Sequence, residues 1–241
     1  MTQAAEARTP ARVPLALEAL VLPDAGMARA AKLGRIRGPL LFAMLASILL
    51  GGALAVRVDG REVTLKQLEM QGKLASMSDR QIEDAQKSTE RIFMVKKVAV
   101  GVFEAPFGLL LGGVGLLLLS WFLRGRSKAS EVFTVAAYGL LPGAITTLVE
   151  AGATWLRPMV SPEGQASVPR TLAALAAAFG HPVIGAAAKV LGAFDVFDLW
   201  GAAMMAFGLA TASQLPVRRA VVGTLVAWIC YRLVRFVALG A

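Results

Sequence analysis

The sequence predicts an all-α polytopic membrane protein, a helical bundle of five transmembrane helices with short interfacial helices. Hydrophobic residues make up 56% of the 241 residues, and the mean hydropathy of +0.63 exceeds that of ordinary soluble domains. Several apolar runs reach the roughly 20 residues that a helix needs to cross a bilayer. The net charge of +9 is therefore expected in cytoplasmic loops and against anionic lipid, and it does not indicate nucleic-acid binding.

Residues 1–38 are expected to form a cytoplasmic tail with an interfacial helix, ahead of a membrane domain over residues 39–241. Apolar residues recur at helical spacing between Leu15 and Leu33, with Pro23 among them. Basic residues follow this stretch, whereas a signal peptide would have them first. The stretch therefore predicts a helix that lies on the membrane surface.

Five spans are expected in the membrane domain, at about 39–56, 98–123, 132–156, 194–213 and 220–239. The polar stretch 57–97 is expected to form an external loop, on the side of the membrane opposite the cytoplasm. Its Ser78-Asp79-Arg80-Gln81 resembles a capping box that opens a helix running into the second span. Residues 171–190 are apolar, but Gly180-His181-Pro182 breaks them into two pieces too short to span. An interfacial helix and a turn are expected there, with a sixth membrane segment as the alternative.

Basic residues near the span ends predict the orientation, because short cytoplasmic loops carry an excess of Lys and Arg. They gather before the first span and after the second and the fourth, as Arg29, Lys32, Arg35, Arg37, Arg124, Arg126, Lys128, Arg218 and Arg219. The N-terminus is therefore expected in the cytoplasm and the C-terminus outside. Abundant Ala and an excess of Arg over Lys hint at a bacterial source, and hence at an inner membrane. Cys230 is the single cysteine, so no intramolecular disulfide or cysteine metal site forms.

Two motifs in the second half of the chain resemble one family. The third span contains Phe133-x-x-x-Ala137-Tyr138-x-x-x-Pro142, and the fourth opens with Asp195-x-Phe197-x-Leu199-Trp200. Their order and spacing, with the five-span layout from about Leu17 to Leu239, resemble the Yip-one domain family of five-span membrane proteins. That family was first described as partners of Ypt/Rab GTPases.

The resemblance implies a fold and a membrane location more firmly than an activity. The N-terminal region here is short and lacks the soluble domain of the eukaryotic members, which leaves GTPase binding doubtful. Two motif residues also have structural interpretations. Trp200 suits an interfacial anchor, and Tyr138 suits a hydrogen bond to a carbonyl freed by Pro142.

Asp195 and Asp198 have two interpretations. Their spacing matches an N-cap and a third-position acid at the start of a helix. Alternatively, they belong to a cluster of intramembrane charges within roughly 10 Å of the outer surface, at ~1.5 Å per helical residue. The cluster comprises Glu104, Glu150, Asp195, Asp198, Arg232 and Arg235. Such residues usually face the bundle and pair, although near the interface they can also snorkel to water.

One pair decides between the cap and the cluster. The fourth and fifth spans are joined by a short loop, so they are expected to be antiparallel neighbours. Counted from their outer ends, Asp198 and Arg235 lie at equal depth, which predicts that they pair. Arg232, one turn deeper, is expected to reach Glu104 or Glu150 instead.

The function expected from these features is that of a non-enzymatic membrane scaffold or adaptor of the Yip-one type, linked to membrane organisation or trafficking. Its expected partners are the lipid bilayer and membrane proteins or a second copy of the chain. The alternative is a transport-related protein whose outward-facing charged cluster handles a small solute or ion. No nucleotide-binding glycine motif, nucleophile elbow or zinc signature occurs, and His181 stands alone, so no enzyme, metal or cofactor is expected.

The predicted topology can be tested by cysteine labelling at Ser76, Ser127 and Gly164. Cysteines at Ser76 and Gly164 should react with an impermeant reagent in intact cells, because both loops are expected outside. A cysteine at Ser127 should react only after permeabilisation, since its loop carries the positive-inside signal. Labelling of Ser127 in intact cells would contradict the orientation.

Overall fold

Helices make up the architecture of the described residues, among which no β-strand occurs. The computed structural model describes residues 14–57, 60–72, 76–157 and 169–239. The helices are α1 (Leu15–Val21), α2 (Pro23–Leu33), α3 (Arg37–Arg57), α4 (Gly60–Met70), α5 (Asp79–Phe122), α6 (Ala129–Gly139), α7 (Leu141–Trp155), α8 (Leu172–Ala178), α9 (Gly185–Gly192), α10 (Val196–Ala212) and α11 (Val217–Leu239). The prediction of an all-α helical bundle is confirmed.

Three stretches are long and apolar enough to cross a membrane: Arg37–Arg57, Val98–Phe122 and Ala129–Trp155. They correspond to α3, to the second half of α5, and to α6 with α7. The helix α10 is shorter and apolar, and α11 has 23 residues, enough in length to span. The chain is therefore a multi-pass membrane protein, and the count of five spans stays a prediction.

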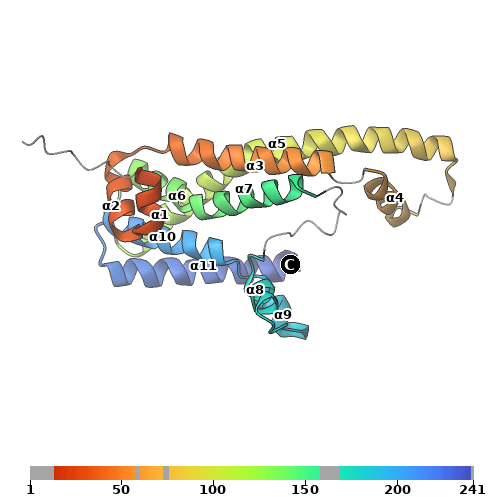
Figure 1. Ribbon diagram of the computed structural model, residues 1–241. Helices are drawn as coiled ribbons and strands as arrows, with labels where there is room; N and C mark the ends of the chain where they lie inside the picture. Colours follow the sequence, from red (N-terminus) through yellow and green to blue (C-terminus); the bar gives the residue numbers. More distant parts are fainter. Residues whose placement is uncertain (1–13, 58–59, 73–75, 158–168, 240–241) are drawn as a thin grey trace, which may run out of the picture.

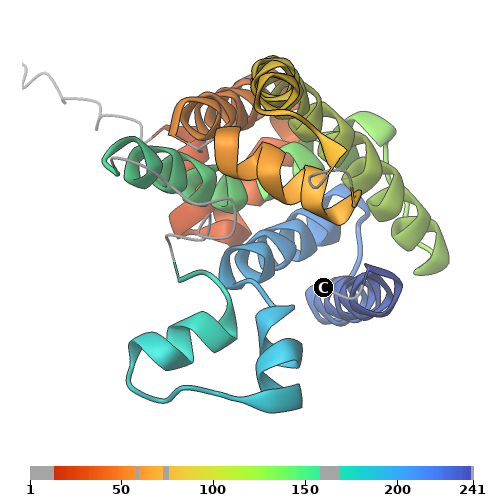
Figure 2. The same ribbon diagram turned by 90° about the vertical axis from the view of Figure 1, so that its right-hand side faces the viewer.

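The long helices run along one common direction and pack side by side (Figures 1 and 2). The first span, α3, packs against both α5 and α7, and α10 packs against α2, α6 and α11. Most of the core lies where α2, α6 and α10 meet, and its larger buried side chains include Met27, Val132, Val135, Met204 and Leu209.

A glycine pair lets α6 and α10 approach closely. A Cβ atom on Gly201 would lie 2.5 Å from the carbonyl oxygen of Gly139, and one on Gly139 would lie 2.4 Å from Cγ of Met205. Small residues of this kind replace side-chain packing by backbone contact, a common device between membrane helices. Their place in the sequence ties the third span to the start of α10.

The third predicted span is one apolar stretch but consists of two helices. The break falls at Leu140, between the end of α6 and the start of α7, with Pro142 in the first turn of α7. Proline has no N–H to donate to the carbonyl of Tyr138, so the helical ladder is interrupted. The hydroxyl of Thr146 donates to the carbonyl oxygen of Pro142 at 3.1 Å.

The capping box predicted at Ser78 is present. The backbone N–H of Ser78 donates to Oε1 of Gln81 at 2.9 Å, and the helix that follows runs for 44 residues without a break. Its first half extends beyond the end of α3, with α4 packed beside it (Figure 1). The described residues of the polar stretch are largely helical, and the helix from Asp79 onward is the one that the capping box predicted.

The N-terminal stretch forms two helices where one was expected, because the chain turns at Leu22 before Pro23. The second helix, α2, has Met27, Ala30 and Ala31 buried against the bundle. A salt bridge of 2.7 Å between Arg29 and Glu18 closes the pair of helices. Its position at the membrane surface stays a prediction.

The segment between the third span and α10 forms two short helices, α8 and α9, which project from the side of the bundle (Figure 2). They contain seven and eight residues, or about 10–12 Å each at ~1.5 Å per residue. Neither can cross a bilayer of about 30 Å. The geometry favours the interfacial interpretation over a sixth span.

The glycine crossing generates a stability prediction. Replacing Gly201 by Ala places a methyl group against the backbone of Gly139, and overpacking of this kind costs about 1–3 kcal/mol. We expect a Tm several degrees below wild type in detergent. Gly115→Ala is the matched control, because a Cβ there meets no atom within 4 Å. Equal Tm values for the two variants would show that the crossing is not tight.

Candidate functional site

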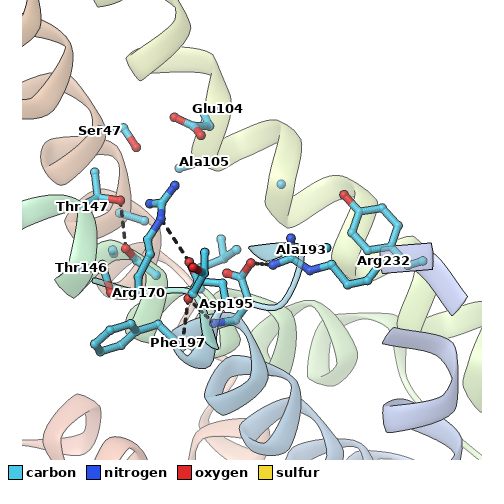
Figure 3. A pocket seen from close by; sticks show the side chains of 18 of the residues that line it. Ser47, Glu104, Ala105, Thr146, Thr147, Arg170, Ala193, Asp195, Phe197 and Arg232 are labelled. Atoms are coloured by element: carbon cyan, nitrogen blue, oxygen red, sulfur yellow. Dashed lines mark hydrogen bonds and ion pairs between the residues drawn. The ribbon is translucent and has the colours of Figure 1, made fainter. Parts of the chain in front are cut away.

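A cavity of about 570 Å³ lies between α3, α5, α7, α10 and α11 (Figure 3). Hydroxyl groups from Ser47, Thr146 and Thr147 line one side of it. Five charged side chains also line the cavity: Glu104, Arg170, Asp195, Asp198 and Arg232. Four of these five are members of the predicted charge cluster, brought together from α5, α10 and α11 and the residue before α10.

Asp195 is the N-cap of α10, as one of the two interpretations expected. Its Oδ1 accepts from the backbone N–H of Phe197 at 2.8 Å and from that of Asp198 at 3.4 Å. These amides have no carbonyl partner within the helix, and a carboxylate here also interacts favourably with the helix dipole. One oxygen of Asp195 therefore fixes where α10 begins.

The other oxygen of Asp195 belongs to an ion-pair network, so the cap and the cluster coexist. Oδ2 lies 3.2 Å from Nε of Arg170, and the Arg170 guanidinium also lies 3.3 Å from Oε1 of Glu150. Glu150, on α7, is 8% exposed and Arg170 is 45% exposed. Arg170 therefore joins the third span to the start of α10.

The backbone holds Arg170 in place. Its carbonyl oxygen accepts from the N–H of Val196 at 2.9 Å, and the N–H of Leu172 donates to the carbonyl of Phe194 at 3.0 Å. Between them, Thr171 and Asp195 form an isolated antiparallel bridge. This short pairing closes the loop that contains α8 and α9 and aims Arg170 into the cavity (Figure 3).

A second ion pair joins Asp198 of α10 to Arg232 of α11, where Arg235 was the expected partner of Asp198. The number of residues between each side chain and the turn that joins α10 to α11 explains the difference. Asp198 lies 14 residues before Ala212, and Arg232 lies 15 residues after Val217. Because the turn sets the depth of both helices, Arg232 matches Asp198, and Arg235 lies nearly one turn further along. The side chain of Arg235 is outside the described residues.

An aromatic pair supports this second ion pair. The Arg232 guanidinium carbon lies 5.6 Å from the ring centre of Trp228, within cation–π distance. The Trp228 ring in turn lies 5.7 Å from that of Phe194. Arg232 is 11% exposed, and Asp198 is 45% exposed, so the carboxylate faces the cavity more openly than its partner does.

Glu104 lines the same cavity but makes no ion pair or side-chain hydrogen bond with another described residue. It projects from α5 opposite Arg170 (Figure 3). With Glu150 included, four carboxylates surround two guanidinium groups, a formal excess of two negative charges. The described site is therefore short of positive charge.

The family-motif residues divide between the core and the cavity. Ala137 and Tyr138 are buried on α6, and the Phe133 ring covers Gly113 of α5, where a Cβ would lie 2.5 Å from it. Phe197 lines the cavity. Leu199 and Trp200 point outward on the exposed side of α10. The interfacial role of Trp200 stays a prediction.

Arg170 is the functional residue that the sequence analysis missed. It lies in a stretch interpreted as an external loop, with no motif around it. The charge balance of the predicted cluster could have indicated it, because the cluster has four acidic residues and only two arginines, which leaves room for a third. Among the described residues, no group of three His, Cys, Asp or Glu side chains is arranged to hold a metal ion.

Helices long enough to span a bilayer, packed around a charged cavity, define an all-α multi-pass membrane protein. The model of the Yip1 domain family matches residues 17–239, nearly the whole chain. The chain therefore belongs to the Yip1 domain family, which confirms the resemblance carried by the two motifs. Comparison with curated proteins and with solved structures finds no match.

A double-mutant cycle on Asp198 and Arg232 tests the second ion pair. We expect Asp198→Asn and Arg232→Met each to lower the Tm in detergent, and the double variant to lose less than the sum. Residues in direct contact couple by about 0.5–3 kcal/mol. The control is the double variant Glu104→Gln with Arg232→Met, which removes the same two charges from residues that do not pair and should therefore show additive losses of Tm. Additive effects for Asp198 and Arg232 would mean that the pair does not form.

Proposed function

We propose that this protein is a non-enzymatic membrane scaffold or adaptor of the Yip1 type, linked to membrane organisation or trafficking. It would bind membrane proteins, lipids or a second copy of itself through its helices and loops, in a bacterial inner membrane with its N-terminus in the cytoplasm. The supporting observation is how the charged residues around the cavity are used. Arg170 and Arg232 connect α7, α10 and α11, so these charges hold helices together.

The stability of such a framework depends on those connections. Removing one partner of a fully buried pair costs about 3–5 kcal/mol, because the other charge is stranded. Arg170 is partly exposed, so solvent screening lowers the expected loss to about 1–2 kcal/mol. That is a substantial share of the stability of a domain, which favours a structural role.

The arm formed by α4 and the first half of α5 offers a surface for partners. It extends past the bundle (Figure 1) and exposes Ile92 and Val95 among charged residues. Nζ of Lys87 lies 2.8 Å from Oε1 of Glu83 on this arm. The hydrogen bond that Lys87 donates, and to a smaller extent its positive charge, lower the pKa of the Glu83 carboxyl. A charged helix with exposed aliphatic residues suits a peripheral, partly polar contact with another protein.

A transport-related role is the second candidate, and the cavity is the observation that favours it. The excess of carboxylates and the position of Glu104 would suit a small cation. Against this role, the guanidinium groups of Arg170 and Arg232 are held by neighbouring carboxylates. The cavity is therefore treated as a structural site first.

Photo-crosslinking separates these functions. With a photoreactive amino acid at Val95, we expect a discrete protein adduct in cells, because the arm is the proposed contact surface. The matched control is Val114, exposed on the membrane-spanning half of α5, which should give no protein adduct. An adduct of twice the chain mass would identify a second copy as the partner.

Liposome flux measurements test the alternative. Purified protein in liposomes should pass potassium or a small alkylammonium ion no faster than empty liposomes. Flux that falls when Glu104 is replaced by Gln would contradict the scaffold proposal and support transport. The absence of an adduct at Val95, together with such flux, would make transport the favoured function and the scaffold role the second candidate.

A further inference from the structure

A groove separate from the charged cavity lies between the end of α5 and the start of α11. It has a volume of about 750 Å³. Leu119 and Phe122 of α5 and Val222 and Val226 of α11 form apolar walls, and Arg218 and Arg219 line its mouth. The groove is at the end of the bundle that carries the basic loops, opposite the arm.

The lining of α11 follows the helical repeat. Arg218, Val222 and Val226 are four residues apart, as are Arg219, Gly223 and Ala227, so one face of the helix lines the groove. At ~1.5 Å per residue this face covers about 12 Å from Arg219 to Ala227. Along this face, the residues are charged at the start of the helix and apolar beyond it. A phospholipid has the same order, with a charged headgroup followed by an acyl chain.

The two arginines of the groove are available for a ligand. Both are exposed, and among the described residues neither forms an ion pair. Arg170 and Arg232, in contrast, are held by carboxylates. Exposed guanidinium groups beside a span end attract anionic headgroups and bind phosphate through paired hydrogen bonds.

A second basic loop lies beside the groove mouth. The Ser120 hydroxyl donates to Oγ of Ser213 at 2.9 Å, and the N–H of Arg126 donates to the carbonyl oxygen of Ser213 at 2.9 Å. These bonds fix the loop after α5 to the loop before α11. Positive charge on both loops therefore surrounds the mouth.

The walls meet because of a glycine. A Cβ on Gly223 would lie 2.8 Å from Cδ1 of Leu123, so the missing side chain lets Leu123, which follows α5, pack directly against α11. Val222, Val226 and Phe122 stay exposed beside that contact. The result is an apolar channel that opens to the surrounding lipid.

We propose that this groove binds one anionic phospholipid, with the phosphate held by Arg218 and Arg219 and an acyl chain along Phe122 and Val226. The occupant follows from charge complementarity at the mouth and from an apolar wall at bilayer depth. A membrane helix of a partner protein would leave both arginines without a counter-charge. This inference goes beyond the scaffold role and does not depend on it.

Native mass spectrometry of the delipidated full-length protein tests the proposal, with phosphatidylglycerol and phosphatidylcholine of identical acyl chains as probes. Wild type should bind phosphatidylglycerol more tightly, with one lipid per chain preferred. Arg218→Gln with Arg219→Gln should reduce that advantage roughly 25-fold, because each basic residue near anionic lipid contributes about fivefold. Arg35→Gln with Arg37→Gln removes the same charge around the start of α3, outside the groove lining and both loops at its mouth, and should reduce it far less.

A charge-neutral variant separates the groove from the charge. Ala227→Trp fills the groove and should abolish the tight phosphatidylglycerol site with all arginines in place. Val114→Trp is its control on a lipid-facing position of α5. Equal losses in the two arginine double variants, or unchanged binding in Ala227→Trp, would overturn the site in favour of diffuse attraction. Equal binding of both lipids by wild type would overturn the headgroup preference.

Discussion

The network centred on Asp195 is the interaction on which the arrangement of the second half of the chain depends. Its two oxygens do different work: one accepts the first amides of α10, and the other contacts Arg170, which also contacts Glu150 of α7. A carboxylate within a membrane bundle is costly unless it is paired and hydrogen-bonded. The need to satisfy Asp195 therefore fixes the start of α10, the closure of the α8–α9 loop and the position of α7 together.

The arginines divide by what surrounds them. At one end, Arg170 and Arg232 lie among carboxylates and hold helices together, with Trp228 packed on Arg232. At the other end, Arg218 and Arg219 form no ion pair among the described residues and are exposed at the start of α11. The same side chain is thus a structural cross-link in the first case and, in our proposal, a binding group in the second. Local charge balance, and not residue type, makes the difference.

Small residues and one proline set how closely the helices approach. Gly139 and Gly201 bring α6 and α10 into backbone contact, and Gly223 makes room for the side chain of Leu123, which follows α5, against α11. Pro142 breaks the third span just after Gly139, so the glycine crossing and the helix break lie within one turn. The helix positions around the cavity therefore depend on the glycines, which have no side chain, and on Pro142, which has no N–H, as much as on the larger side chains of the core.

The sequence by itself determined the helix class, the membrane location, the family, the capping box at Ser78 and the N-cap at Asp195. Each is a local property: apolar length, residue spacing within one turn, or a motif. Tertiary structure alone decided that Arg170 enters the charged site and that Arg232 pairs with Asp198. Such pairs join residues far apart in the chain, so their depth depends on the turn between α10 and α11 and on the bridge at Thr171. The residue pattern along a single helix does not indicate which residues of other helices lie beside it.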